Sequence, residues 1–239
     1  MSWYKQSRAL PAIENKYYEP GTEPRGLEYL NNLLTPEHAK KLSEPKMQYL
    51  NSGWYGSAFT FDNTNIVRKY TSDSEEVKIA KKILSKQKNH KPLPGIVYVY
   101  SVRDLSRDIY RNKTNKNPNN MMELGEYFLS EITMEKVIPL SEKQKKIFEY
   151  NFWNIKIKVK NKTDDYIIDY IRKERELEKT YGEDKKYTDE DYEFINIIIN
   201  FARTVLSANY SDRDIHPGNV GLRKGRELVV LDLGSVDIV

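Results

Sequence analysis

Short apolar runs alternate with turn-forming residues in two parts of the chain. The runs are rich in aromatic and β-branched residues at Met47 to Leu50, Ala58 to Phe61 and Asn65 to Tyr70. Gly, Asn and Asp separate them, so the pattern predicts a three-stranded antiparallel meander. Ile96 to Val102 and Tyr127 to Val137 are expected to form two further strands.

Helical spacing replaces this alternation elsewhere. Ser72 or Asp73 is a suitable N-cap for a helix whose apolar face includes Ile79, Ala80 and Ile83. Further helices are predicted from Pro36 after the N-cap Thr35, from Ser141 to about Phe152, from Asp164 to about Tyr181, and from Asp189 to Asn209.

Three other segments complete the pattern. Residues 103–120 are polar and rich in Asn and Lys, which predicts a loop or insertion. Ile155, Ile157 and Val159 alternate with lysines, a spacing that fits either a strand or the end of a helix. Val220 to Leu222 and Leu228 to Leu231 are expected to pair as a hairpin through Lys224-Gly225.

The composition of the 239 residues excludes several classes of protein. No apolar run reaches the 18 or more residues of a membrane span, and the first residues lack the apolar region of a secretory signal. Cys is absent and the three His are far apart, so neither disulfides nor a zinc site are expected. The net charge of +4 is mild, and nucleic-acid binding is not indicated. We therefore expect a cytoplasmic protein with no membrane partner.

A first group of candidate residues lies in the meander and the helix after it. Gly53-x-x-Gly56 would let backbone N–H groups approach a phosphate. Two glycines between strands usually have only a structural role, in forming the turn. Lys69 would reach the same phosphates, and a carboxylate on the following helix would orient it. Glu76 shares the apolar face of that helix and is preferred to Glu75. The alternative is that both acids only complement the helix dipole.

A second group lies near the C-terminus. Asp214 is followed five positions later by Asn219 and thirteen positions after that by Asp232. Carboxylate and amide oxygens are ligands that suit Mg²⁺. Asp214 would accept a proton from, or orient, an attacking hydroxyl, while Asn219 and Asp232 would hold Mg²⁺ on nucleotide phosphates.

The order of these motifs resembles the protein-kinase-like superfamily over about residues 47–236. The resemblance implies an α+β, bilobal kinase-like fold that binds ATP and Mg²⁺ between its lobes. It implies an N-lobe with a small antiparallel sheet at 47–137 and a truncated, mainly helical C-lobe at 138–239. An insertion at about 151–188 and an extension with a short helix at 1–46 would complete the chain.

The resemblance also assigns roles residue by residue. In the N-lobe, the family's glycine-rich loop matches Gly53, Gly56 and Ala58, with Asn51 in place of the first glycine, and the catalytic lysine and its glutamate match Lys69 and Glu76. The backbone of Glu135 and Val137 would bind adenine. In the C-lobe, Asp214 matches the catalytic aspartate, and Asn219 and Asp232 match the metal ligands. Asp212 replaces the usual His of the catalytic loop, which puts the packing behind that loop in doubt. His216 is expected to cap the loop rather than act as a base.

Two departures bear on the substrate. The motif Asp214-Ile-His-Pro-Gly-Asn219 is also similar to the corresponding motif of aminoglycoside and choline phosphotransferases and of ABC1-type kinases. Only Ser235 to Val239 follow Gly234, so we expect no activation segment and a minimal kinase, compatible with a phage genome and therefore a host cytoplasm.

These features lead to one preferred hypothesis and three alternatives. The preferred function is transfer of phosphate from ATP to serine or threonine of a protein, including this chain itself. The alternatives are a small-molecule kinase, a nucleotide- or partner-binding pseudokinase acting as an inhibitor or structural protein, and an enzyme that transfers AMP. The sequence leaves the oligomeric state and the role of residues 1–46 open.

Overall fold

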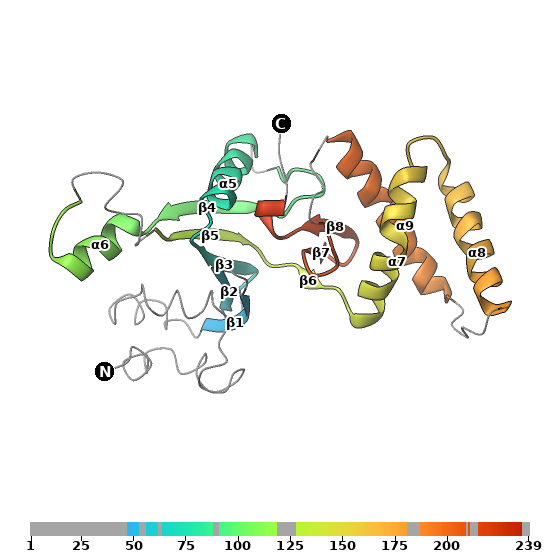
Figure 1. Ribbon diagram of the computed structural model, residues 1–239, viewed down its shortest axis with the longest axis horizontal. Coiled ribbons are helices and arrows are strands. Elements are labelled where there is room, and N and C mark those ends of the chain that lie inside the picture. The colour runs from blue at the N-terminus through green and yellow to red at the C-terminus, as the bar shows by residue number, and fades with distance from the viewer. Residues whose placement is uncertain are drawn as a thin grey trace. The chain divides into compact units, whose positions relative to one another are not determined.

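The protein is a mixed α+β structure with small antiparallel sheets and several helices (Figure 1). The computed structural model describes residues 47–52, 56–61, 64–87, 91–118, 128–180, 187–208, 210 and 215–235. The described chain divides into two compact units. Positions up to 89 and from 98 to 136 form the first, and positions 90–97 and from 137 onward form the second. The expected helix after Thr35 lies outside the described residues.

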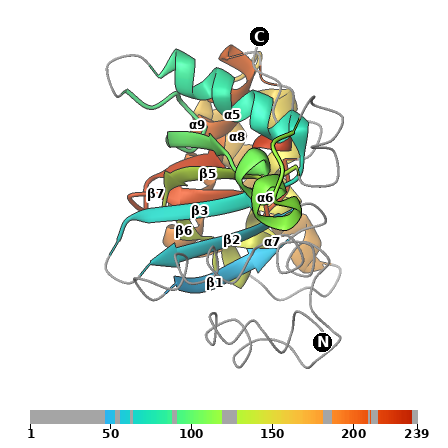
Figure 2. The same cartoon turned by 90° about the vertical axis from the view of Figure 1, so that its left-hand side faces the viewer.

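The first unit is built on a five-stranded antiparallel sheet (Figure 2). Its strands are β1 (Met47–Ser52), β2 (Gly56–Phe61), β3 (Ile66–Thr71), β4 (Val99–Asp104) and β5 (Ser130–Glu135), in the order β1-β2-β3-β5-β4. The three-stranded meander is therefore confirmed. In register, Lys69 of β3 lies between Ala58 of β2 and Ile132 of β5.

Helix α5 (Ser74–Lys86) packs against β3, β4 and β5. Asp73 is its N-cap, as the sequence predicts, and the side chain of Asp73 accepts hydrogen bonds from the N–H groups of Glu75 and Glu76. Glu76, Ala80 and Ile83 are buried as predicted, but Leu84, which was also expected on this face, is exposed, and Val77 is buried in addition. Because the cap fixes where the helix starts, it also fixes which of the first residues face the sheet.

The predicted loop at 103–120 is wrong, because α6 (Ser106–Thr114) occupies its first half. Leu105 and Ile109 are buried and anchor this otherwise polar helix. The strand expected from Ile96 starts at Val99 instead, since Ile96 forms an isolated parallel bridge with Val230 of the second unit.

Three helices form the core of the second unit. They are α7 (Glu142–Lys158), α8 (Asp164–Thr180) and α9 (Asp189–Ser207), and both α7 and α8 pack against α9. The rings of Phe148 and Phe152 stack with centroids 4.7 Å apart, and both approach Phe201 of α9. The ambiguous segment at 155–159 is the end of α7. Among the described residues, no helix is both long and apolar enough to cross a bilayer.

A small antiparallel sheet completes the second unit. Its strands are β6 (Ile138–Pro139), β7 (Val220–Arg223) and β8 (Glu227–Val230), and the short helix η4 (Leu233–Ser235) follows. The predicted hairpin is confirmed, because Lys224 and Gly225 at the turn have φ angles of 50° and 71°. Residues 90–97 attach to this hairpin. The Val230 N–H donates to the Gly95 carbonyl over 2.9 Å, and Arg223 Nη2 donates to the Ile96 carbonyl over 2.6 Å.

Candidate functional site

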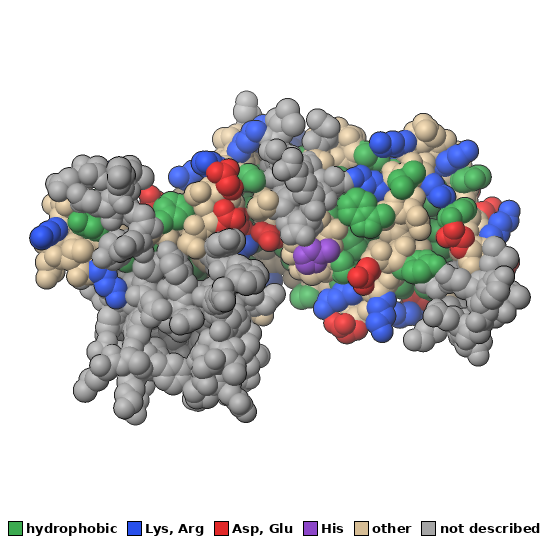
Figure 3. Space-filling model, viewed as in Figure 1, with side chains coloured by type: hydrophobic (Ala, Val, Ile, Leu, Met, Phe, Trp, Pro, Cys, Tyr) green, Lys and Arg blue, Asp and Glu red, His purple; other side chains and the backbone are tan. Residues whose placement is uncertain are grey.

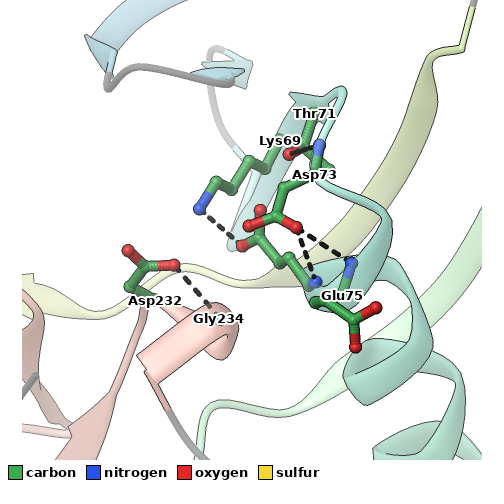
Figure 4. Close-up of polar contacts among 7 residues, drawn as sticks. Lys69, Thr71, Asp73, Glu75, Asp232 and Gly234 are labelled. Carbon is green, nitrogen blue, oxygen red and sulfur yellow. Dashed lines mark hydrogen bonds and ion pairs between the residues drawn. The ribbon is translucent and has the colours of Figure 1, made fainter. Parts of the chain in front are cut away.

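Lys69 of β3 forms an ion pair with Glu76 of α5 inside the first unit (Figure 4). The Lys69 Nζ and Glu76 Oε1 atoms are 2.5 Å apart. The Glu76 side chain is only 3% exposed, whereas the Lys69 side chain is 21% exposed. The Glu76 carboxylate is therefore buried, whereas the Lys69 side chain is partly exposed.

The local chain explains why Glu76 rather than Glu75 meets the lysine. The Thr71 hydroxyl accepts a hydrogen bond from the Asp73 N–H over 3.1 Å, and Asp73 in turn caps α5. The helix then starts in a register that turns Glu76 toward the sheet. Glu75 points to solvent and pairs instead with Lys78.

Two other predicted phosphate-binding positions are close to Lys69 in the sheet. Ala58 is its direct cross-strand partner, and Gly56 pairs with Thr71 two residues further along β3. The start of β2 is therefore beside the lysine, as a phosphate-binding turn would require. Gly53 lies outside the described residues.

The segment predicted to bind adenine begins at Glu135, and Tyr98 holds that residue. The Glu135 N–H donates to the Tyr98 carbonyl over 2.9 Å, and Glu135 Oε1 accepts from the Tyr98 N–H over 2.7 Å. Sequence reasoning missed Tyr98, since nothing in the spacing links positions 37 residues apart. Val137 belongs to the second unit, where its Cγ2 lies near Gly221.

Asn219 and Asp232 lie at the same end of the β7–β8 hairpin. Val220 pairs with Val230, and the Leu231 N–H donates to the Asn219 carbonyl over 2.8 Å. Asp232 follows directly and accepts a hydrogen bond from the Gly234 N–H over 3.3 Å (Figure 4). Backbone pairing thus brings the backbone of Asn219 close to that of Asp232, although the two residues are thirteen positions apart in sequence.

The turn before Asn219 is closed by His216. Its Nδ1 accepts a hydrogen bond from the Gly218 N–H over 3.1 Å, and the Asn219 N–H donates to the His216 carbonyl over 2.9 Å. This agrees with the capping role expected for His216.

Two of the residues predicted to bind a metal, Asn219 and Asp232, lie in the described part of the second unit. Among its described residues and those of the first unit, no three His, Cys, Asp or Glu form a group able to hold a metal ion. Asp214, the predicted catalytic residue, lies outside the described residues. Among the described residues, Asn219 and Asp232 remain as the predicted metal ligands. So few protein ligands would suit Mg²⁺, because this ion usually keeps several waters and binds substrate phosphates.

The sequence matches no known protein-family model, and a search of curated proteins finds no significant match. A function for this chain must therefore be inferred from the chemistry of the residues described above.

Proposed function

We propose that this protein is an ATP- and Mg²⁺-dependent phosphotransferase with a kinase-like, bilobal organisation, and that its acceptor is a serine or threonine hydroxyl of a protein. The observation that carries the proposal is the ion pair of Lys69 with the buried Glu76. This pair lies next to the start of β2, where the predicted glycine turn ends.

A buried ion pair is a weak means of stabilising a fold. The cost of removing two charges from water is often as large as the attraction between them, and a well-packed apolar pair can be as stable. A fixed lysine is useful, however, where phosphates must be held in one position. Phosphoryl transfer depends mostly on such positioning and on neutralising charge.

Asn219 and Asp232 fit the proposed metal. Their amide and carboxylate oxygens are of the type that Mg²⁺ prefers, and the hairpin holds their backbones at one end. Bound there, Mg²⁺ would neutralise charge on the nucleotide phosphates. The chain's own contribution would be the backbone pairing at this end of the hairpin, which fixes the positions from which the two side chains extend.

The remaining roles follow the resemblance. Asp214 would orient the acceptor hydroxyl or take its proton, and the backbone of Gly53 and Gly56 would approach the phosphates. Since the Glu135 N–H is bonded to Tyr98, adenine would use the carbonyl of Glu135 together with the backbone of Val137.

The test is incubation of the full chain with radiolabelled ATP, Mg²⁺ and a protein extract, followed by electrophoresis. We expect labelled protein with the wild type and none with Asp214→Ala. Lys224→Ala, at the far turn of the same hairpin, is the matched control and should label normally. Absence of label from the wild type, or equal label with Asp214→Ala, would contradict the proposal.

A thermal-shift experiment separates this proposal from a pseudokinase that binds a partner but no nucleotide. ATP should raise the unfolding temperature more with Mg²⁺ than with a chelator, because a ligand that binds only the folded state stabilises it. No response to either mixture would favour a protein that does not bind nucleotide.

A further inference from the structure

The outward face of α7 carries a line of exposed apolar side chains, which we call the α7 ridge. It consists of Tyr150, Trp153 and Ile157, which are 44%, 48% and 70% exposed. Their spacing of three and four residues places them on one side of the helix. The opposite side carries Phe148, Phe152 and other buried residues that face α9. The core therefore does not account for the α7 ridge.

Positive charge surrounds this line. Between positions 142 and 162 the sequence has seven lysines, two glutamates and no arginine, a net charge of +5. Lys146 and Lys160 continue the line of the α7 ridge at its two ends, since they lie four residues before Tyr150 and three after Ile157. Lysines in the last turn complement the helix dipole, but that effect does not explain those beyond the helix end.

Several of these lysines lie along aromatic rings. The ammonium groups of Lys156, Lys158 and Lys162 lie 5.0, 3.8 and 4.7 Å from the ring centroids of Trp153, Tyr170 and Tyr166. Burial, together with the nearby charge of Lys160, lowers the pKa of Lys156 below its ordinary value. Figure 3 shows hydrophobic and basic side chains next to each other over the helices of the second unit. Lys143 and Lys145 pair with Asp191 and Glu142, so the positive charge beside the apolar groups comes mainly from the other lysines of this segment.

We propose that the α7 ridge docks on the surface of an anionic lipid bilayer, with its apolar side chains in the headgroup region and the lysines on lipid phosphates and carboxylates. Charge complementarity favours an anionic occupant, since anionic lipids attract basic segments that lie close to the membrane surface. Tyr and Trp suit this boundary because each has an apolar body and a polar tip. Lysine stems extend through such a boundary while their charges stay in water.

Three observations favour lipid over the other anionic partners. Ile157, the most exposed member, has no ring on which a nucleic-acid base could stack. Arginine, which binds phosphate and carboxylate in a paired geometry, is absent from 142–162. The α7 ridge is also the outward side of a helix, which a bilayer can accept without a matching groove.

The test is flotation of the full chain with vesicles of phosphatidylcholine alone and of phosphatidylcholine with about one third phosphatidylserine. We expect flotation only with the anionic vesicles, and at least a ~10-fold loss of vesicle affinity for Trp153→Ser/Ile157→Ser. Leu84→Ser is the matched control, because Leu84 is also an exposed apolar residue of a helix but lies in the first unit. Lys156→Glu/Lys160→Glu tests the charge separately from the apolar groups and should also abolish flotation.

Several outcomes would overturn this proposal. They are equal flotation of the wild type and Trp153→Ser/Ile157→Ser, or no flotation with anionic vesicles. Binding of a nucleic-acid oligonucleotide or self-association through the α7 ridge, in the absence of vesicle binding, would assign the surface to that partner instead. Phosphotransfer in solution should be unchanged in all of these variants, so the two proposals can fail independently.

Discussion

The two groups of candidate residues are held in place by different kinds of interaction. In the first unit, Lys69 depends on the buried carboxylate of Glu76, which belongs to another element. In the second unit, Asn219 and Asp232 are brought together by the backbone hydrogen bonds of one hairpin. In the first unit, the Lys69 side chain thus has both a structural role and a proposed chemical role. In the second unit, backbone atoms have the structural role, and the side chains of Asn219 and Asp232 have the proposed chemical role.

This difference has a practical meaning for mutagenesis. Removing Lys69 leaves an acidic group in the interior, so loss of activity will come with loss of stability. Removing the side chain of Asp232 leaves the hairpin pairing untouched, so activity can be lost from an intact fold. Measuring both activity and the free energy of unfolding for variants in each unit therefore tests whether the two units hold their candidate residues differently.

Lys69→Met is expected to have the largest combined effect. It should abolish phosphotransfer and lower the free energy of unfolding by roughly 3 kcal/mol, because the charge of Glu76 stays buried without its ammonium partner. Adding Glu76→Leu should restore most of the stability but none of the activity. Urea denaturation and labelling with ATP measure the two quantities. A Lys69→Met protein of wild-type stability would show that the ion pair has no structural role.

Asp232→Ala should lower the rate of transfer by at least ~10³-fold, which is typical for loss of a group that stabilises the transferred charge. Its free energy of unfolding should change by less than about 0.5 kcal/mol, because Asp232 lies outside the paired strands. The measurements are steady-state kinetics and urea denaturation. Destabilisation as large as that of Lys69→Met would remove the contrast between the two units.

Gly221→Ala tests whether the backbone frame of the second unit carries its candidate residues. A Cβ there would lie 2.6 Å from Val137 Cγ2 and 3.1 Å from the Ile138 carbonyl oxygen. We expect a loss of about 2 kcal/mol from overpacking, together with reduced activity, although no proposed ligand is altered. A Cβ at Gly225 would have no atoms within 4 Å, but the φ of 71° there is unfavourable for alanine. Gly225→Ala therefore tests the effect of backbone strain in the turn without a steric clash. Full activity in Gly221→Ala would argue against the hairpin as the frame.

Asp191 provides a buried acid outside the proposed chemistry. Burial alone would raise the pKa of Asp191, but hydrogen bonds from Lys143 and Thr188 outweigh this and lower it below its ordinary value. Because folding lowers the pKa of Asp191, the charged carboxylate stabilises the folded state above the unfolded pKa of about 3.9. This stabilisation is lost as the pH falls through the pKa of the folded state. Asp191→Asn should therefore cost about 1 kcal/mol at pH 7 and progressively less below about pH 4.

Urea denaturation of wild type and Asp191→Asn at several pH values provides the check. Phosphotransfer at pH 7 should stay close to that of the wild type. A stability difference that does not change with pH would mean that the Asp191 charge contributes nothing to stability.

The sequence predicts this fold best where one local signal decides the structure. Asp73 is the N-cap of α5, and Lys224-Gly225 forms the hairpin turn, because each depends on a few neighbouring residues. Helix α6 was missed because only Leu105 and Ile109 anchor it, too few for a helical period to be visible. The alternation at 155–159 left strand and helix end open for another reason, and the helix end is confirmed. Ile155 and Val159 are buried one helical turn apart, while Ile157 between them is exposed.

The candidate site was predictable to a similar degree. The choice of Glu76 over Glu75 follows from the cap and the helical period. The bond between Glu135 and Tyr98 and the bond between Arg223 and Ile96 could not be predicted, since both join segments far apart in sequence. Long-range contacts of this kind depend on how strands pair in three dimensions, which no local pattern records.

Residues 90–97 have a consequence for anyone who divides this protein into fragments. The chain leaves the first unit at position 89, returns at 98 and leaves again after 136. A fragment ending at Lys136 would therefore carry Ile96 and Val97, both fully buried in the whole chain, without the hairpin that covers them. A single cut after position 136 therefore cannot yield two intact halves, because it separates residues 95–97 from the hairpin that they contact.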